Sequence, residues 1–290
     1  MIVLGLNAFG HDAAAVLLVD GDVVFASSQE RFDRMRHSAA YPQEAVQAAL
    51  THAGLRPADV DAIAFPWTRS MARWRKGWHV LKGLPRSRAY FTDPPDSRLP
   101  DRRGYLKAMR GLERRLQSEG FAADVHRIPH HLAHAASGAL ALPEGSGAVF
   151  TADGMGEWTT AATWKAQGHR PKRLRRAVYP HSPGKVYAAV TQWLGFYPES
   201  DEGKTMGLAA YGAGGDEDDR SDRWQQAFDL LVFAHAQDGP LCWVPTRMFG
   251  FPWGEARLFS DRFVDLIGPP RRPDEALRDG DAAVSYTHLR

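Results

Sequence analysis

Short apolar runs separated by polar turns open the chain, which is the pattern of strands connected by hairpins. These runs predict three antiparallel strands over residues 2–6, 13–19 and 23–27. A polar loop over residues 30–37 leads to a predicted helix that extends to residue 53, and Gly54 follows it as a usual C-cap residue. Residues 60–65 predict a further buried strand. Strands mixed with helices in this way indicate the α/β fold class.

The middle of the chain differs from the rest in composition. Between about residues 69 and 120, aromatic residues stand among many arginines and lysines, and a Pro-Pro pair divides the stretch. Its second piece, residues 102–119, has apolar residues at helical spacing: Leu106, Met109, Leu112 and Leu116. We interpret residues 69–120 as an insertion that covers a substrate pocket. A nucleic-acid surface is the alternative, which is not favoured because no RNA-binding motif occurs.

The second half of the chain repeats the order of elements with which the first half opens. Three strands are predicted again, over residues 148–153, 159–165 and 174–179. Such an echo is a signal of internal duplication. The other elements expected here are a strand at residues 125–128, a helix from Gly184 to residue 194, an acidic loop at residues 212–219 and a helix at residues 224–233.

Composition and charge are those of an ordinary globular protein. The 290 residues are 44% apolar and 24% charged, and the net charge of +2 argues for neither a nucleic-acid nor a membrane partner. One cysteine excludes an internal disulfide framework and fits a reducing compartment. No signal-peptide pattern and no apolar run of membrane-spanning length occurs. We therefore expect a cytoplasmic protein.

Two histidines four residues apart are the first candidates for chemistry. His130 and His134 border an Ala-rich stretch, residues 131–142, that predicts a helix, and their spacing puts both imidazoles on one helix face. Asp153 follows an apolar run and precedes Gly154 and a second glycine, which makes it the best local third ligand. Two imidazoles and a carboxylate suit iron, manganese or zinc. For the histidine pair without the aspartate, a purely structural role would be preferred.

A series of motifs, in a fixed order along nearly the whole chain, carries a resemblance to a known family. They are Gly-Leu-Asn-Ala-Phe-Gly-His-Asp from Gly5, Gln-Glu-Arg-Phe-x-Arg from Gln29, His-His-Leu-Ala-His-Ala from His130, Asp-Gly-x-Gly-Glu-Trp from Asp153, and Glu-Gly-Lys-Thr-Met-Gly-Leu-Ala-Ala-Tyr-Gly from Glu202. Together they resemble the O-carbamoyltransferases of Nod-factor, cephamycin and aminoglycoside biosynthesis. That family is similar to the tRNA-threonylcarbamoyl transferases in its metal-bearing half. The resemblance therefore implies the actin/Hsp70-like ATPase fold, with duplicated half-domains and a ligand between them.

The resemblance also implies a role for each matching site residue. His11 would act as the base for an acceptor hydroxyl, with Asp12 beside it, and Arg36 would contact a phosphate or carbamoyl adenylate. The nucleotide or adenylate would further contact Asp153, Gly154, Gly184, Gly203 and Lys204. A divalent metal, for which we expect iron, would be held by His130, His134 and Asp153.

Structural alternatives stay open for several of these residues. The contact between His11 and Asp12 could serve just to stabilise their turn, and Arg36 could be a solvated loop residue. Residues 202–205 resemble a phosphate-binding loop but lack the upstream glycine of a true P-loop, so Lys204 could simply pair with Glu202.

The reaction that the resemblance implies is transfer of a carbamoyl group to a hydroxyl. Carbamoyl phosphate and ATP would give carbamoyl adenylate in a C-terminal domain, and the group would then move to a small-molecule, natural-product acceptor. Two other functions stay open: a relative of the tRNA-threonylcarbamoyl transferases, and a nucleotide- or metal-binding module without activity. A homodimer is compatible with all three.

The same comparison predicts the domain organisation. Residues 1–145 would form the first actin-like half-domain, and residues 146–290 would begin a second, incomplete one. The C-terminal adenylate-forming domain would be absent. Because residues 284–290 do not continue the resemblance, we expect a fragment that is inactive by itself.

Overall fold

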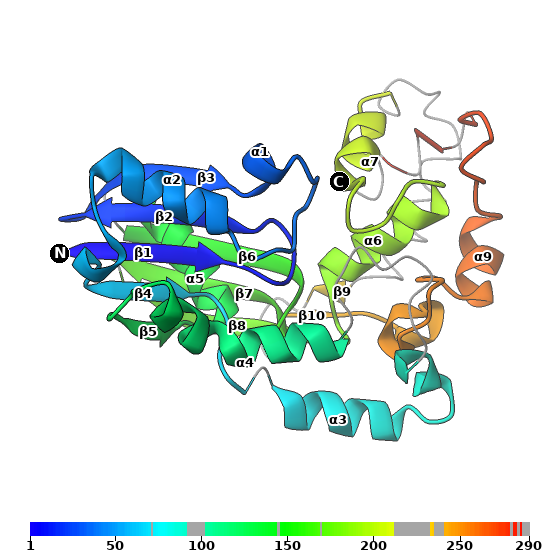
Figure 1. Cartoon of the computed structure of the whole chain (residues 1–290). Coiled ribbons are helices and arrows are strands. Elements are labelled where there is room, and N and C mark those ends of the chain that lie inside the picture. The colour runs from blue at the N-terminus through cyan, green and yellow to red at the C-terminus, as the bar shows by residue number, and fades with distance from the viewer. Residues whose placement is uncertain are drawn as a thin grey trace. The chain divides into compact units, whose positions relative to one another are not determined.

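The structure is a computed structural model in two compact units (Figure 1). It describes residues 1–70, 72–91, 102–143, 146–168, 170–211, 233–234, 241–278, 281–282 and 285. Unit 1 comprises Met1–Met71 and Asp93–Ala133, and unit 2 comprises Ala72–Thr92 and His134–Arg290. The division falls within helix α5 (His130–Leu140), which is itself continuous.

Unit 1 is built on a mixed five-stranded sheet in the order β3-β2-β1-β4-β5. The strands are β1 (Ile2–Asn7), β2 (Ala14–Val19), β3 (Asp22–Ser28), β4 (Ala62–Phe65) and β5 (Asp124–Arg127). The first three pair antiparallel, whereas β1, β4 and β5 run parallel. The three predicted opening strands are therefore confirmed, because short apolar runs and tight turns define them locally.

Two helices cover one face of this sheet. Helix α2 (Gln43–Ala53) and helix α4 (Arg102–Ser118) place apolar residues in one core with Leu4, Ile63 and Phe65 of the strands. Met109, Leu112 and Leu116 are buried there, as their helical spacing predicts. Helix α2 ends where predicted, because Gly54 adopts a left-handed conformation and its N–H bonds to the carbonyls of the last turn. The short elements are α1 (Glu30–Asp33) and η1 (Pro57–Asp59).

Unit 2 contains a three-stranded sheet that is a second antiparallel meander. Its strands are β6 (Ser146–Gly156), β7 (Thr159–Gln167) and β8 (Arg170–Val178), in the order β6-β7-β8. Helix α6 (Pro183–Trp193) follows and packs on β6 and β7. The succession of three strands and a helix thus occurs in both units, as the repeated sequence pattern predicts.

Aromatic side chains fill the core next to α6. Phe249, Phe251, Phe259 and Phe263 form a buried cluster with Trp193. The remaining elements of unit 2 are α3 (Arg73–Lys82), η2 (Arg86–Phe91), α7 (Glu202–Ala209), β9 (Phe233–Ala234), β10 (Cys242–Trp243), η3 (Thr246–Met248), η4 (Phe251–Trp253) and α9 (Asp261–Ile267).

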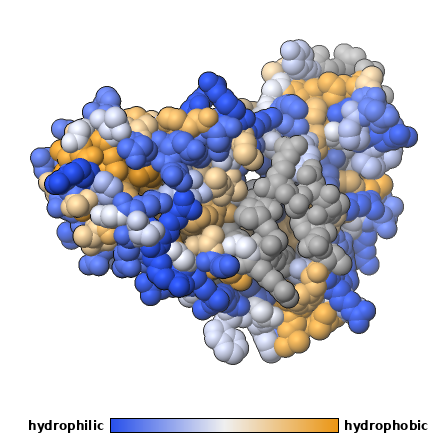
Figure 2. Space-filling view, viewed as in Figure 1, coloured by the Kyte–Doolittle hydropathy of each residue, from blue (hydrophilic) through white to orange (hydrophobic). Residues whose placement is uncertain are grey.

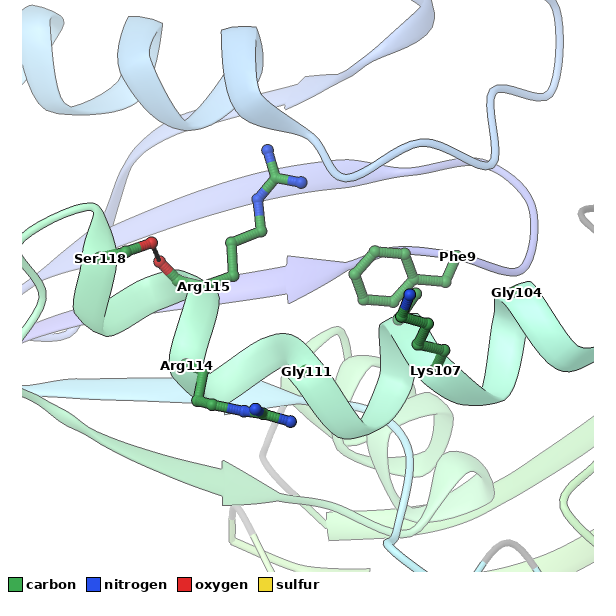
Figure 3. Close-up of a pocket in the computed structure, with 8 residues that line it drawn as sticks. Phe9, Gly104, Lys107, Gly111, Arg114, Arg115 and Ser118 are labelled. Carbon is green, nitrogen blue, oxygen red and sulfur yellow. Dashed lines mark hydrogen bonds between the residues drawn. The ribbon is translucent and has the colours of Figure 1, made fainter.

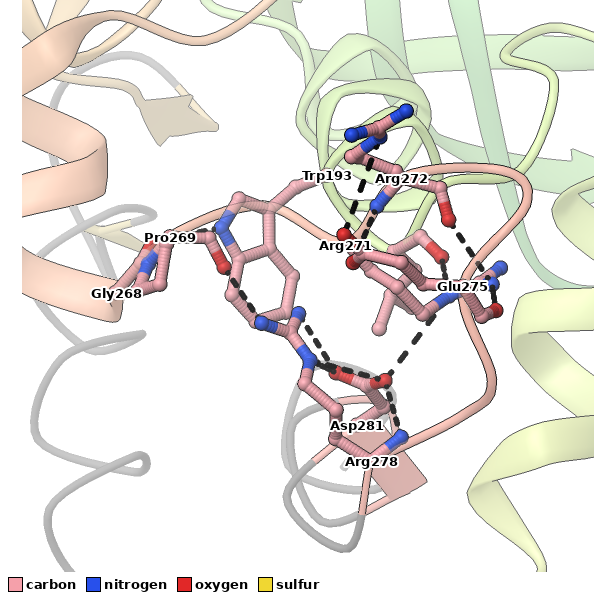
Figure 4. A network of polar contacts seen from close by, with 9 residues as sticks. Trp193, Gly268, Pro269, Arg271, Arg272, Glu275, Arg278 and Asp281 are labelled. Atoms are coloured by element: carbon pink, nitrogen blue, oxygen red, sulfur yellow. Dashed lines mark hydrogen bonds and ion pairs between the residues drawn. The ribbon is translucent and has the colours of Figure 1, made fainter.

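A polar network fastens the segment after α9 to the end of α6 (Figure 4). Arg271 is 7% exposed, and its Nε donates to the carbonyl of Leu194 at 2.6 Å. Asp281 is 1% exposed and forms an ion pair with Arg278 at 3.1 Å. The indole N–H of Trp193 donates to the carbonyl of Gly268 at 2.9 Å. Each buried polar group of this network therefore has a partner, as burial requires.

The α/β class is confirmed, and three local predictions are wrong. Strand β6 does not end at Asp153 but continues to Gly156, because Gly156 pairs with Thr159 to close the hairpin. Residues 202–205 are not a loop but the first turn of α7, since Thr205 is buried and its hydroxyl bonds to that of Thr191 at 3.0 Å. The polar loop at residues 30–37 begins with the helical turn α1.

Some predictions lie outside the described residues. These are the acidic loop at residues 212–219 and all of the helix at residues 224–233 except Phe233, which begins β9. In the part of the chain that is described, no helix is both long and apolar enough to cross a membrane. The face of the molecule that Figure 2 shows carries both hydrophilic and hydrophobic side chains among the described residues.

Candidate functional site

Helix α5 presents the histidine pair at its N-terminal end. Pro129 starts the helix, because its carbonyl accepts the N–H groups of Leu132 at 2.9 Å and Ala133 at 3.1 Å. His134 follows His130 by four positions, which is slightly more than one helical turn, so both side chains lie on one face. His130 is half-buried and His134 is exposed.

The ring of His130 is held by residues that follow strand β4. Its Nδ1 lies 3.2 Å from the carbonyl oxygen of Pro66, and its ring stacks on Trp67 with the centroids 4.2 Å apart. A carbonyl oxygen only accepts, so Nδ1 is the protonated nitrogen of neutral His130 and Nε2 carries the lone pair. This is the arrangement that orients a metal-binding histidine.

Asp153 lies in an irregular stretch of β6. The pairing of β6 with β7 shifts between Ala152 and Gly156, so the backbone around Asp153 leaves the regular ladder. The hydroxyl of Ser182, the N-cap of α6, lies 3.2 Å from the carbonyl of Asp153 and 2.8 Å from that of Gly154, and donates to these oxygens. Bulges of this kind often redirect a side chain beside a site.

The three predicted ligands lie together. Ligand atoms of His130, His134 and Asp153 are all within 4.8 Å of one another. His130 and His134 lie on one continuous helix, and His134 and Asp153 both lie in unit 2. The cluster is therefore formed by residues of α5 and β6. Two imidazole nitrogens and a carboxylate oxygen form a donor set that fits iron(II), manganese or zinc.

A second cluster of polar side chains lies at the turn between β1 and β2. The carboxylate of Asp12 bonds to Nδ1 of His11 through one oxygen and to Nδ1 of His37 through the other, both at 2.8 Å. The side-chain amide of Asn7 donates to the carbonyls of His11 and Asp12, each at 3.0 Å, and supports the left-handed conformation of Asp12. The predicted contact between His11 and Asp12 is present in this turn.

The carboxylate of Asp12 is stabilised in its charged form. Burial acts to raise its pKa, but hydrogen bonds from His37 and His11 outweigh that effect and lower the pKa below the usual aspartate value. Asp12 is therefore a carboxylate at neutral pH, which can accept from both imidazoles.

His37 is the member of this cluster that the motifs did not reveal. It is 25 positions from Asp12 in the sequence. The available signal is strand register, because Ala14 pairs with Ser28 and this brings the end of β3 beside the start of β2. A histidine in the loop after β3 then lies near the turn that carries Asp12.

The other predicted residues are distributed over the two units. In unit 1, Arg36 is exposed in the loop after α1. In unit 2, Gly203 and Lys204 lie in the first turn of α7, and Lys204 pairs with Asp201 at 2.9 Å rather than with Glu202. Gly184 lies at the start of α6, where it touches the backbone of Asp153.

Unit 1 also has a pocket of about 580 Å³ along α4 (Figure 3). Phe9, from the same turn as His11, forms one wall, and Lys107 lies beside it. The rest of the lining is Gly104, Ala108, Gly111, Arg114, Arg115 and Ser118. This lining contains cationic side chains and no acidic one, so it suits an anionic group.

Comparison with known proteins shows the family. Residues 2–226 match the family described as "Carbamoyltransferase N-terminus". The uncharacterized protein sll1178 of Synechocystis sp. is 33% identical over 98% of this chain and 45% of its own length. The nodulation protein NolNO of Sinorhizobium fredii is 33% identical over 78% of this chain and 31% of its own length. The chain thus spans less than half the length of these relatives.

Among solved structures, YeaZ from Pseudomonas aeruginosa is similar over 62% of this chain and 68% of its own, with 15% identity and a TM-score of 0.35. The family assignment rests on the sequence matches. The described residues form a mixed α/β fold, in which one three-stranded antiparallel meander opens the sheet of unit 1 and another forms the sheet β6-β7-β8 of unit 2. The chain belongs to the carbamoyltransferase family, of which it carries the N-terminal region.

Proposed function

We propose that the chain forms part of an O-carbamoyltransferase. This enzyme would move a carbamoyl group from carbamoyl adenylate to a hydroxyl of a small-molecule acceptor. Carbamoyl phosphate and ATP are the proposed sources of the adenylate. The observation that carries this proposal is the convergence of His130, His134 and Asp153 in a chain of this family. The residue types match a metal site with positions left for substrate.

The three residues are proposed to hold a divalent ion, for which we expect iron. His130 would bind through Nε2, because its Nδ1 donates to Pro66. A bound ion of this kind supplies Lewis-acid polarisation of a carbonyl or phosphoryl oxygen. The part played by the chain is to fix the donor set through α5 and the bulge of β6.

His11 is proposed to take the acceptor proton. Its Nδ1 is bonded to Asp12, so Nε2 of the neutral imidazole carries the lone pair. As Nε2 takes the hydroxyl proton, the hydroxyl oxygen forms a bond to the carbamoyl carbon. The bond from that carbon to the adenylate phosphate breaks, and AMP leaves. The exposed position of His11 suits contact with a diffusing acceptor.

The proposal assigns the remaining predicted residues to the carbamoyl adenylate. Arg36 offers a guanidinium for its phosphate, and Gly184 lies at the N-terminus of α6, where backbone N–H groups favour anions. Gly154, Gly203 and Lys204 are candidates for the nucleotide. We further propose that acceptors approach His11 from the pocket along α4, because Phe9 lines this pocket and lies in the same turn as His11.

The test uses the longest protein that the gene encodes, with carbamoyl phosphate, ATP and a panel of hydroxylated small molecules. Mass spectrometry should show a carbamoylated acceptor with the wild type and with the control variant His126→Ala, an exposed histidine on β5. The His11→Ala variant should still form carbamoyl adenylate but transfer nothing. Adenylate formation without transfer by the wild type to any acceptor would refute the proposal, and normal transfer by His11→Ala would remove His11 from it.

A further inference from the structure

In the cluster of His11, Asp12 and His37, the exposed fraction of the side chain decreases from one residue to the next. Their side-chain exposures are 65%, 52% and 34% in that order. Asp12 stands between the two histidines and uses a different oxygen for each. The outer histidine can meet a substrate, whereas the inner one is better suited to act on the carboxylate.

The backbone of His37 is tied to the same turn. The N–H of Ala13, next to Asp12, donates to the carbonyl of Ser38 at 2.8 Å. The N–H of His37 donates to a carboxylate oxygen of Glu30 at 3.1 Å. The loop that carries His37 is therefore fixed at one point to the turn before β2 and at another to α1, and these bonds hold the imidazole next to Asp12.

The protonation pattern follows from the acceptor between the two rings. An ionised carboxylate only accepts, so Nδ1 of His37 and Nδ1 of His11 are both donors. The Nε2 atom of His37 is buried and has no hydrogen-bond partner among the described residues. An N–H there would be buried without an acceptor, so in the neutral ring the proton belongs on Nδ1, which bonds to Asp12.

We infer that His37 is a positioning residue, which holds the Asp12 carboxylate so that His11 keeps its proton on Nδ1 and presents Nε2 to the acceptor hydroxyl. This inference rests on the proposed carbamoyl transfer for its functional meaning. Without the bond to His37, one oxygen of Asp12 loses its donor and the carboxylate can rotate away from His11. The imidazole of His11 then exchanges between its two tautomers, and only one of them has the basic Nε2.

Two amide variants separate positioning from bulk. The side-chain N–H of Asn reaches about as far as Nδ1 of histidine, whereas the N–H of Gln reaches about as far as Nε2. His37→Asn therefore keeps a donor for Asp12, and His37→Gln does not. Both are polar and of similar size, so a difference between them reports the hydrogen bond.

The first measurement is nitrogen-15 NMR of the imidazole rings in this chain, which needs no enzymatic activity. The wild type and His37→Asn should show His11 with its proton fixed on Nδ1. His37→Ala and His37→Gln should show it exchanging between both nitrogens. A His11 tautomer that is unchanged in all variants would overturn the inference, whether or not the proposed transferase activity exists.

The second measurement is steady-state kinetics of the longest protein that the gene encodes. For His37→Ala and His37→Gln, kcat should fall by about tenfold to a hundredfold, which is less than the roughly 10²–10⁴-fold contribution of a general base because His11 itself remains, while KM for the acceptor changes little. His37→Asn should recover most of kcat. A fall in kcat that Asn does not restore, or an effect only on KM, would contradict the positioning role.

Discussion

The backbone of Gly184 contacts the backbone of Asp153 so closely that a side chain has no room between them. A Cβ atom on Gly184 would lie 2.8 Å from both the carbonyl carbon and the carbonyl oxygen of Asp153. Carbon atoms not bonded to each other are favourable only at about 3.5 Å or more. Glycine at this position therefore allows α6 to begin directly against the irregular stretch of β6 that carries a predicted metal ligand.

We expect Gly184→Ala to shift Asp153 and weaken the site. Because the clash is with backbone, the substitution should cost about 1–3 kcal/mol of the free energy of unfolding and lower metal affinity. Gly203→Ala is the matched control, since nothing lies within 4 Å of its Cβ position in helix α7. Urea titration and metal titration of both variants check this. If Gly184→Ala had the same unfolding free energy and metal affinity as the wild type, the close approach would have no effect on the site.

The network around Arg271 should contribute strongly to stability. Asp281 is 2% exposed in its side chain and pairs with Arg278 at 3.1 Å and with Arg271 at 4.0 Å. Asp281→Ala leaves these guanidinium groups without their carboxylate, so it should cost about 3 kcal/mol. Asp274→Ala, at an exposed ion pair, should cost less than about 1 kcal/mol. Equal unfolding midpoints of the two variants in urea would contradict this account of the network.

The thiol of Cys242 should react slowly in the folded protein. Burial raises its pKa from 9.0 to about 11. At pH 8 its thiolate fraction should be roughly a hundredfold smaller than in the unfolded chain. The thiol should therefore resist a thiol reagent until urea unfolds the protein, and reaction at the same rate in both states would be the contrary result.

The same shift has a consequence for stability. The folded pKa is raised, so the contribution of Cys242 is fully present below about pH 9 and is lost as pH rises through about 11. Cys242→Ala should therefore lose less stability than the wild type between these pH values.

Much of the fold could be predicted because its signals are local. The strands β1 to β3 are short apolar runs separated by tight turns, and α4 shows its buried face through the spacing of Met109, Leu112 and Leu116. The juxtaposition of His130 and His134 is local as well, since it follows from one helical turn. These features need no knowledge of which distant segments meet.

The features that were missed depend on contacts between distant segments. His37 meets Asp12 only because the registers of β1, β2 and β3 bring their loops together. Residues 202–205 are helical because Thr205 is buried against Thr191, a contact that no local glycine pattern reveals. The extension of β6 past Asp153 depends on its pairing with β7.

The central claim is that His130, His134 and Asp153 hold a divalent ion, and metal content tests it most directly. The protein is incubated with iron(II) and then separated from free metal, both under anaerobic conditions. Elemental mass spectrometry should then show about one retained ion per chain. His134→Ala should retain far less, whereas the control His126→Ala should match the wild type, and circular dichroism should show both folded. Wild-type metal content in folded His134→Ala would contradict the ligand set.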